Sequence, residues 1–327
     1  MPCPPAKITL EDQFAALDAL SEVEDVAQRE SALRGALRGK SNFVVARAAR
    51  LTGQWEFKKM IPDMVAAFER FMKNPVKTDK GCAAKLAIVE ALNALDYDSE
   101  EVFLQGIRHF QLEPAYGAPE DTADILRGKC AFGLVRIGYP HVLPELADLL
   151  LDKASATRQA AVRAVGGVGG EAAEMLLRMK AIAGDSEPQI TGECFTVLME
   201  IAPERSLDFV ARYLESEDAW LANQAALTLG ESKIPAAFEI LRALWEKHAT
   251  TEQRGELLLP LALHRSEEAF QFLLHVIEEA HQSLACSALE NIKYCASDDA
   301  RRDAVRKAVE ERDEKAVHAA YTKNSKE

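Results

Sequence analysis

Apolar and small residues recur at helical spacing along most of this chain, and one stretch shows the pattern most clearly. Residues Leu126–Asp152 predict two short helices with a tight joint at Gly138–Pro140. In the first helix the small and apolar positions gather on one face, because successive residues of an α-helix turn by about 100°. These positions are Cys130, Ala131, Gly133, Leu134 and Ile137.

The same pattern returns at a nearly constant interval. Copies begin at residues 126, 157, 190, 221, 253 and 281, so their spacings are 31, 33, 31, 32 and 28. A second marker has the same period, since Asp152, Asp185 and Asp218 lie 33 residues apart, each where an acid that caps the next helix is expected. A period of roughly 30–35 residues with two helices in each copy indicates stacked helical hairpins.

The repeated columns resemble short bacterial HEAT-like repeats of the phycobilin-lyase type, whose pattern is roughly V-R-x-x-A-A-x-A-L-G-x-I-G-x-P. The match is best at Leu126–Pro140 and Thr157–Gly170, and it covers about residues 40–300. In the second stretch the matching residues are Arg158, Ala161, Ala164, Gly166 and Gly169. The resemblance implies an all-α fold, a right-handed α-α superhelix (solenoid) of about eight HEAT-like repeats. It does not specify function, because such repeats occur in scaffolds, lyases, glycosylases and hydroxylases.

We expect one continuous domain over residues 1–327. Residues 1–40 would form N-terminal capping helices, residues 41–297 the repeats, and residues 298–327 a C-terminal capping helix and tail. The first residues are expected to be frayed, and Asp298–Asn324 is expected to form a single closing helix. Both ends are rich in charged residues, as is typical of the polar caps that stop a solenoid from stacking further.

One segment interrupts the regular spacing. Residues Gln111–Thr122, with the sequence QLEPAYGAPEDT, contain two prolines and a glycine and predict a loop. The loop stretches the interval between Lys80 and Leu126 to 46 residues. Long loops on a regular scaffold often carry function, so Tyr116 is a candidate contact residue. The alternative is an insertion that the fold merely tolerates.

Composition narrows the classes of partner. The chain has 327 residues and a net charge of −13, which disfavours nucleic acid because phosphate binding needs a basic surface. The longest strongly apolar run, Leu257–Leu263, is far shorter than the roughly 18 residues of a membrane span, and the N-terminal residues do not resemble a secretory signal. We therefore expect a cytoplasmic protein that does not insert into membranes.

No pattern of catalytic, cofactor-binding or metal-binding residues can be recognised. The six cysteines lack C-x-x-C spacing, and the seven histidines make no H-E-x-x-H pair. The glycine-rich string Val165–Gly170 lacks the Lys-Ser/Thr that follows in a phosphate-binding loop, so its glycines are assigned to helix packing. We therefore predict no cofactor, although distant repeats can still bring reactive groups together.

The second helix of each repeat should line a concave face. The columns that point there are unexpectedly apolar, and charged residues flank them, a combination that suits a groove for a helix or an extended peptide. The predicted binding residues are Phe132, Val135, Met199, Leu227, Leu259, Lys129, Arg136, Arg163, Glu193 and Glu200. The alternative is that these apolar residues are buried between neighbouring helices.

The sequence thus favours a non-catalytic scaffold that binds a protein or peptide partner through the concave face of a HEAT-like solenoid. The alternative is a lyase-like or other enzyme whose site is assembled across repeats on that face. A small molecule is not excluded as a ligand.

Overall fold

The computed structural model describes residues 9–324, and their fold is all-α apart from one short hairpin. The chain divides into two compact units, one ending at Val168 and the other beginning at Gly169. The predicted all-α class is confirmed. The expectations for residues 1–8 and 325–327 lie outside the described residues.

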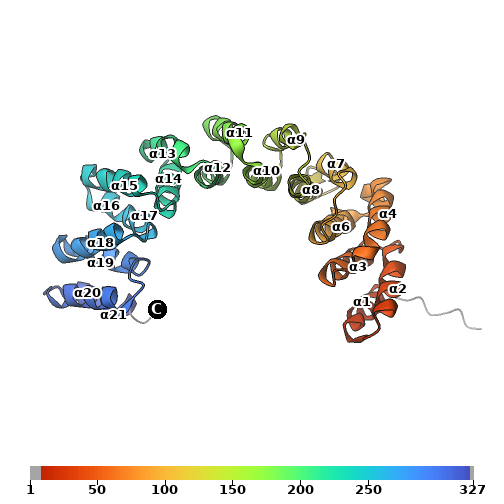
Figure 1. The fold of residues 1–327 in the computed structure, drawn as a ribbon, viewed down its shortest axis with the longest axis horizontal. Coiled ribbons are helices and arrows are strands. Elements are labelled where there is room, and N and C mark those ends of the chain that lie inside the picture. Colours follow the sequence, from red (N-terminus) through yellow and green to blue (C-terminus); the bar gives the residue numbers. More distant parts are fainter. Residues whose placement is uncertain (1–8, 325–327) are drawn as a thin grey trace, which may run out of the picture. The chain divides into compact units, whose positions relative to one another are not determined.

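In the first unit, helices pair into successive hairpins of an A-helix and a B-helix (Figure 1). The A-helices are α2 (Val26–Leu37), α4 (Ile61–Met72), α7 (Glu101–Ile107) and α9 (Val142–Leu149). The B-helices are α3 (Asn42–Gln54), α6 (Ala83–Ala94), α8 (Asp124–Arg136) and α10 (Ser155–Val168), and each packs against the next. Shorter elements are α1 (Leu10–Asp18), η1 (Ala19–Glu22), η2 (Lys58–Met60), α5 (Pro75–Thr78) and η3 (Lys80–Cys82).

The second unit repeats this arrangement. Its A-helices are α11 (Gly170–Ala183), α13 (Pro203–Ala211), α15 (Pro235–Lys247), α18 (Glu267–Glu279) and α20 (Asp299–Glu310). The B-row contains α12 (Pro188–Ile201), α14 (Ala219–Glu231), α16 (Thr251–Glu256), α17 (Leu258–Leu263), α19 (Gln282–Ile292) and α21 (Lys315–Asn324). The 3-10 helix η4 (Arg212–Glu215) follows α13.

The template helix α8 shows why small residues recur. Its predicted inward face is buried at Cys130 and Leu134, and a Cβ atom added at Gly133 would lie 2.5 Å from the ring of Phe103. A glycine here therefore lets α8 approach α7 closely. The predicted joint after α8 is also confirmed, since Gly138 adopts a φ of 66°, which glycine reaches without steric cost.

The three periodic aspartates precede B-helices, as their spacing predicts. Asp218 is the N-cap of α14, and its Oδ1 accepts a hydrogen bond from the backbone N–H of Trp220 at 2.9 Å. The Oδ1 atoms of Asp152 and Asp185 lie 2.8 and 2.9 Å from the backbone nitrogens of Ala154 and Glu187, which come just before α10 and α12. The predicted capping is therefore confirmed at Asp218, whereas Asp152 and Asp185 stabilise the turn that leads into the next helix.

The closing segment differs from the prediction. Instead of one helix, α20 and α21 are separated by residues 311–314. The side chain of Arg312 explains the break, because its Nη1 donates to the backbone oxygens of Ile277 at 2.6 Å and Ala280 at 2.9 Å. These bonds to the end of α18 hold the chain in a turn where its own sequence favours a helix.

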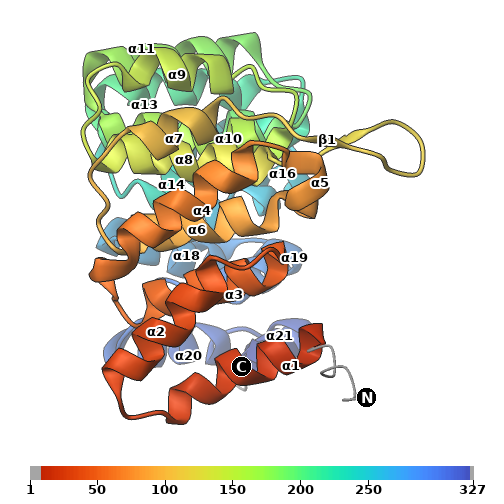
Figure 2. The same cartoon turned by 90° about the vertical axis from the view of Figure 1, so that its right-hand side faces the viewer.

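The predicted loop at Gln111–Thr122 contains a β-hairpin. Strands β1 (Leu112–Glu113) and β2 (Glu120–Asp121) pair antiparallel, with Leu112 opposite Asp121 and Glu113 opposite Glu120. The hairpin extends away from the neighbouring helices of the first unit (Figure 2). The prediction of a plain loop was therefore wrong at its two arms.

Candidate functional site

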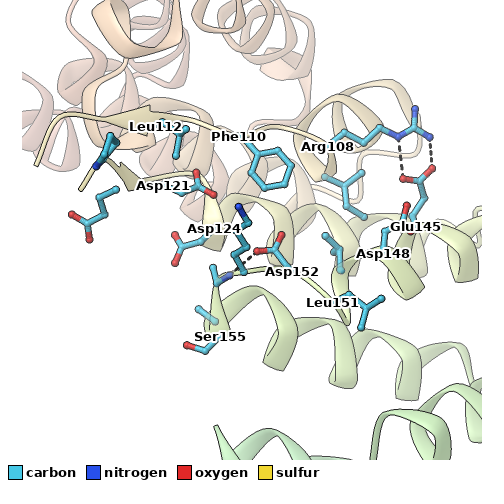
Figure 3. A pocket seen from close by; sticks show the side chains of 17 residues that line it. Arg108, Phe110, Leu112, Asp121, Asp124, Glu145, Asp148, Leu151, Asp152 and Ser155 are labelled. Carbon is cyan, nitrogen blue, oxygen red and sulfur yellow. Dashed lines mark hydrogen bonds and ion pairs between the residues drawn. The ribbon is translucent and has the colours of Figure 1, made fainter. Parts of the chain in front are cut away.

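A hollow of about 1260 Å³ lies in the first unit between the hairpin and the connection from α9 to α10 (Figure 3). Residues at the end of α7 and the start of α8 complete its walls. The lining includes the side chains of Arg108, Phe110, Leu112, Glu120, Asp121, Asp124, Glu145, Asp148, Leu151, Asp152 and Lys153.

The hairpin is attached at its base by a buried polar network. Gln111 is buried, and its Nε2 donates to the backbone oxygen of Asp79 at 2.8 Å and to Glu113 at 2.6 Å. The buried ammonium of Lys85 donates to Gln111 Oε1 at 2.8 Å and forms an ion pair with the Asp79 carboxylate at 3.0 Å. Because buried polar groups are costly to leave unpaired, these bonds fix the first arm of the hairpin on α6.

Glu113 joins the hairpin to the chain on either side. Its Oε1 accepts hydrogen bonds from the backbone N–H of Gly81 at 2.7 Å and from the hydroxyl of Thr122 at 3.0 Å. Burial alone would raise the pKa of Glu113, but hydrogen bonds from Gln111, Gly81 and Thr122 outweigh it and lower the pKa. The carboxylate is thus held charged and acts as a structural acceptor.

Arg127 does not line the hollow but contacts three residues that do. Its buried guanidinium contacts Asp121 at 2.7 Å and Asp152 at 2.8 Å, and it donates to the backbone oxygen of His109 at 3.0 Å. The guanidinium carbon also lies 4.2 Å from the centre of the Phe110 ring. One side chain therefore positions the hairpin, the aromatic ring and the start of α10.

The same contacts lower the pKa of Asp121. Burial would raise its pKa, but the backbone N–H groups of Gln111 and Ala123 and the Arg127 guanidinium together lower it. Asp121 and Asp152 are therefore both paired with Arg127, whose single positive charge offsets one of their two negative charges.

Three large apolar side chains are left exposed around the hollow. Phe110, Leu112 and Leu151 are 58%, 61% and 79% exposed, respectively. Phe110 and Leu112 come from the hairpin side, and Leu151 comes from the opposite wall (Figure 3). A concentration of exposed apolar side chains around a concave surface is typical of a docking site. Tyr116, the predicted contact residue, is fully exposed at the hairpin tip and does not line the hollow.

The lining is strongly acidic, with six carboxylates against two basic side chains. Glu145 is engaged by Arg108, whose Nε donates to it at 3.0 Å. Among the residues that the structure describes, Glu120, Asp124 and Asp148 form no ion pair. The hollow therefore presents uncompensated negative charge beside its apolar surface.

Burial makes three cysteine thiols of the described residues weakly acidic. Burial raises the pKa of Cys82 and of Cys194 to about 12, so both thiols are protonated and poorly nucleophilic at neutral pH. Burial also raises the pKa of Cys130 well above its ordinary value. Within residues 9–324, no group of three or more histidine, cysteine, aspartate or glutamate side chains is placed to hold a metal ion.

Part of the predicted B-helix face also forms a surface in the first unit. Lys129, Phe132 and Arg136 lie together on α8 and, with Glu90 and Asn93, line a shallow hollow of about 460 Å³. Phe132 is 38% exposed, and Lys129 forms an ion pair with Glu90 at 3.3 Å.

The other predicted binding residues differ in exposure. Arg163 and Glu200 are exposed, whereas Val135, Leu227, Leu259 and Glu193 are half-buried. Met199 is only 7% exposed, so it offers little surface to a partner. Met199, Leu227, Leu259, Glu193 and Glu200 belong to the second unit, apart from the hollow on α8.

The sequence pattern predicts the loop at residues 111–122 but does not indicate the other residues that line the larger hollow. Phe110, Leu151, Asp124 and Asp148 fall outside the repeated columns, and Leu112 lies in the insertion without any periodic pattern. The available signal was the stretched interval before Leu126, which marked where the regular array is interrupted.

No protein-family model matches the chain, and no curated protein matches it in sequence. Among solved structures, an engineered protein is 16% identical, with 96% of this chain and 94% of that chain covered and a TM-score of 0.39. The complex of CpcE and CpcF of phycocyanin lyase from Nostoc is 14% identical, with 85% and 92% covered and a TM-score of 0.36. Human deoxyhypusine hydroxylase in complex with glycerol is 16% identical, with 89% and 92% covered and a TM-score of 0.30.

These likenesses are too weak to transfer an activity or a set of residues. In the part of the chain that the structure describes, no helix is both long and apolar enough to cross a bilayer. What the structure establishes is the fold: the chain is an all-α protein built from helical repeats.

Proposed function

We propose that this protein is a non-catalytic binding module that holds a peptide segment of a partner protein in the hollow beside the hairpin. The observation that carries the proposal is the exposure of Phe110, Leu112 and Leu151 around one concave surface. Exposed apolar side chains of this size lose their contact with water when a partner covers them, which contributes about 25 cal/mol for each Å² buried.

The walls of the hollow are held in place before any partner arrives. Arg127 ties the hairpin to the start of α10, and Gln111 ties it to the residues before α6. A binding surface that is already ordered loses less conformational entropy on association, so more of its contact energy appears as affinity. This property suits a docking site on an otherwise regular scaffold.

The sequence-based alternative, a lyase-like or other enzyme, lacks a comparable observation among the described residues. Asp121, Asp152 and Glu145 are occupied by arginines, and the buried thiols described above are protonated. Membership of the HEAT-like family and a cytoplasmic location remain predictions from the sequence.

The proposal can be tested with a phage-displayed library of random dodecapeptides selected on the immobilised full-length protein. We expect enriched peptides with micromolar affinity, the range typical of short segments that bind a preformed groove. The double variant Leu112→Ser/Leu151→Ser should bind these peptides at least about tenfold more weakly, because two exposed anchors worth roughly 1 kcal/mol each are removed. Titration by fluorescence anisotropy gives the dissociation constants.

Two control variants locate the binding surface. Val26→Ser/Val76→Ser removes two exposed apolar side chains elsewhere in the first unit and should leave affinity unchanged. Phe132→Glu tests the face of α8 that the sequence singled out. Failure to enrich any peptide, or equal binding by the Leu112/Leu151 variant, would contradict the proposed function. If only Phe132→Glu lowered the affinity for the peptides, the binding site would lie on the B-helix face of α8 instead.

A further inference from the structure

The charge around the hollow indicates what kind of segment it holds. Resting on the proposed function, we infer that the partner segment is cationic, with an apolar residue between two basic ones. The inference comes from the order of side chains along the hollow: a free carboxylate, an apolar centre and a second free carboxylate.

Three lining carboxylates form no ion pair among the described residues: Glu120 in β2, Asp124 and Asp148. The last two lie at opposite sides of the apolar centre. Asp124 begins α8 near the base of the hairpin, and Asp148 lies on α9. In Figure 3, the ring of Phe110 lies between them. A segment that placed its apolar side chain on Phe110 would therefore carry its flanking residues toward one carboxylate on each side.

Three other carboxylates of the lining are paired with arginines of the chain. Arg127 contacts Asp121 and Asp152, and Arg108 engages Glu145. A ligand cation near these acids would have to compete with an arginine already in place, whereas at Asp124 and Asp148 it displaces no arginine. The unpaired acids therefore select the charge of the occupant more strongly than the paired ones.

The net charge of the whole protein also favours a cationic partner. With a net charge of −13, the chain repels anionic partners and speeds the approach of cationic ones. Long-range attraction alone does not specify a site, however, so the local carboxylates and the general field must be separated by experiment.

The first arm of the test uses three synthetic heptapeptides with the full-length protein. One has two lysines at each end and leucine–phenylalanine–leucine between them, the second replaces the lysines by glutamates, and the third replaces the apolar centre by serine–glycine–serine. We expect the first to bind at least about tenfold more tightly than either of the others, since only it satisfies both charge and apolar contact. Equal binding by the first and second peptides would overturn the inference.

The second arm uses protein variants with matched charge. Asp124→Asn/Asp148→Asn and the control Asp98→Asn/Glu24→Gln each remove two exposed or half-exposed carboxylates and bring the net charge from −13 to −11. We expect the first variant to bind the lysine-flanked peptide roughly fivefold more weakly at low salt, and the control to bind like the wild type. Equal losses in both variants would show that only the general field attracts the peptide and would overturn the inference.

The two proposals fail in different ways. If the library yields peptides that depend on Leu112 and Leu151 but are neutral or acidic, the partner chemistry is wrong and the binding function stands. If neither the library nor the heptapeptides bind, the binding function itself fails. Thermal denaturation of each variant distinguishes loss of binding from loss of folding.

Discussion

At the scale of single residues, Arg127 is the side chain on which the site depends most. It is fully buried and forms ion pairs with two carboxylates, and its guanidinium lies against the Phe110 ring. A buried charge network of this kind is stable only when every member is paired, since each ion has lost its hydration. Its value to the protein is the fixed position that it gives to the hairpin.

We predict that Arg127→Met destabilises the first unit by about 3 kcal/mol, because Asp121 and Asp152 would stay partly buried and lose their partner. The control Arg38→Met removes an exposed ion pair with Asp63, which Arg34 continues to bind, and should cost less than about 1 kcal/mol. Urea denaturation followed by circular dichroism measures both. Similar losses for the two variants would show that the network does not hold the fold.

At the scale of elements, the repeated helices and the hairpin have different origins. The helices follow from local periodicity: Cys130 and Leu134 are buried on α8 because they share a face, and Asp218 caps α14 because it stands directly before that helix. These features need only neighbouring residues, so the sequence predicts them. The array of helical hairpins is the result.

The hairpin could not be predicted in this way. Each of its strands is two residues long, too short for an alternating pattern. Gln111 reaches Asp79 and Lys85, which are far away in the sequence, and no local rule pairs them. The break at Arg312 has the same kind of cause, since its partners lie at the end of α18. Tertiary contacts therefore determine the backbone conformation of both segments.

The base of the hairpin should loosen in acid. The pKa values of Glu113 and Asp121 are lowered in the folded protein, so each carboxylate stabilises the fold at pH values above its ordinary pKa of roughly 4. This stability is lost as the pH falls from there through the lowered pKa values, because the folded state must then take up protons that it disfavours.

We therefore predict that the urea midpoint falls between pH 6 and about pH 3, and that Asp121→Asn reduces the size of this fall. The variant should also be less stable than the wild type at pH 6, where the wild-type carboxylate is charged and paired with Arg127. An unchanged dependence on pH in Asp121→Asn would show that this carboxylate does not contribute. The exposed control Asp98→Asn should follow the wild type.

At the scale of the whole molecule, the described chain combines helical repeats with an insertion at residues 111–122 that departs from them. The helical repeats supply the buried frame, and the insertion supplies the exposed Leu112 and part of the acidic wall of the hollow. The second unit has its own exposed surfaces, but among the described residues the hairpin belongs to the first unit. We therefore assign partner recognition to the first unit.

The most direct test is hydrogen–deuterium exchange of the full-length protein, with and without a saturating peptide selected from the random library. We predict slower exchange at residues 108–124 and 148–156, which form the walls of the hollow, and little change elsewhere. The same measurement on Leu112→Ser/Leu151→Ser should show no protection at equal peptide concentration. Protection confined to residues 129–136 of α8, or to the second unit, would contradict the assignment of binding to the hairpin hollow.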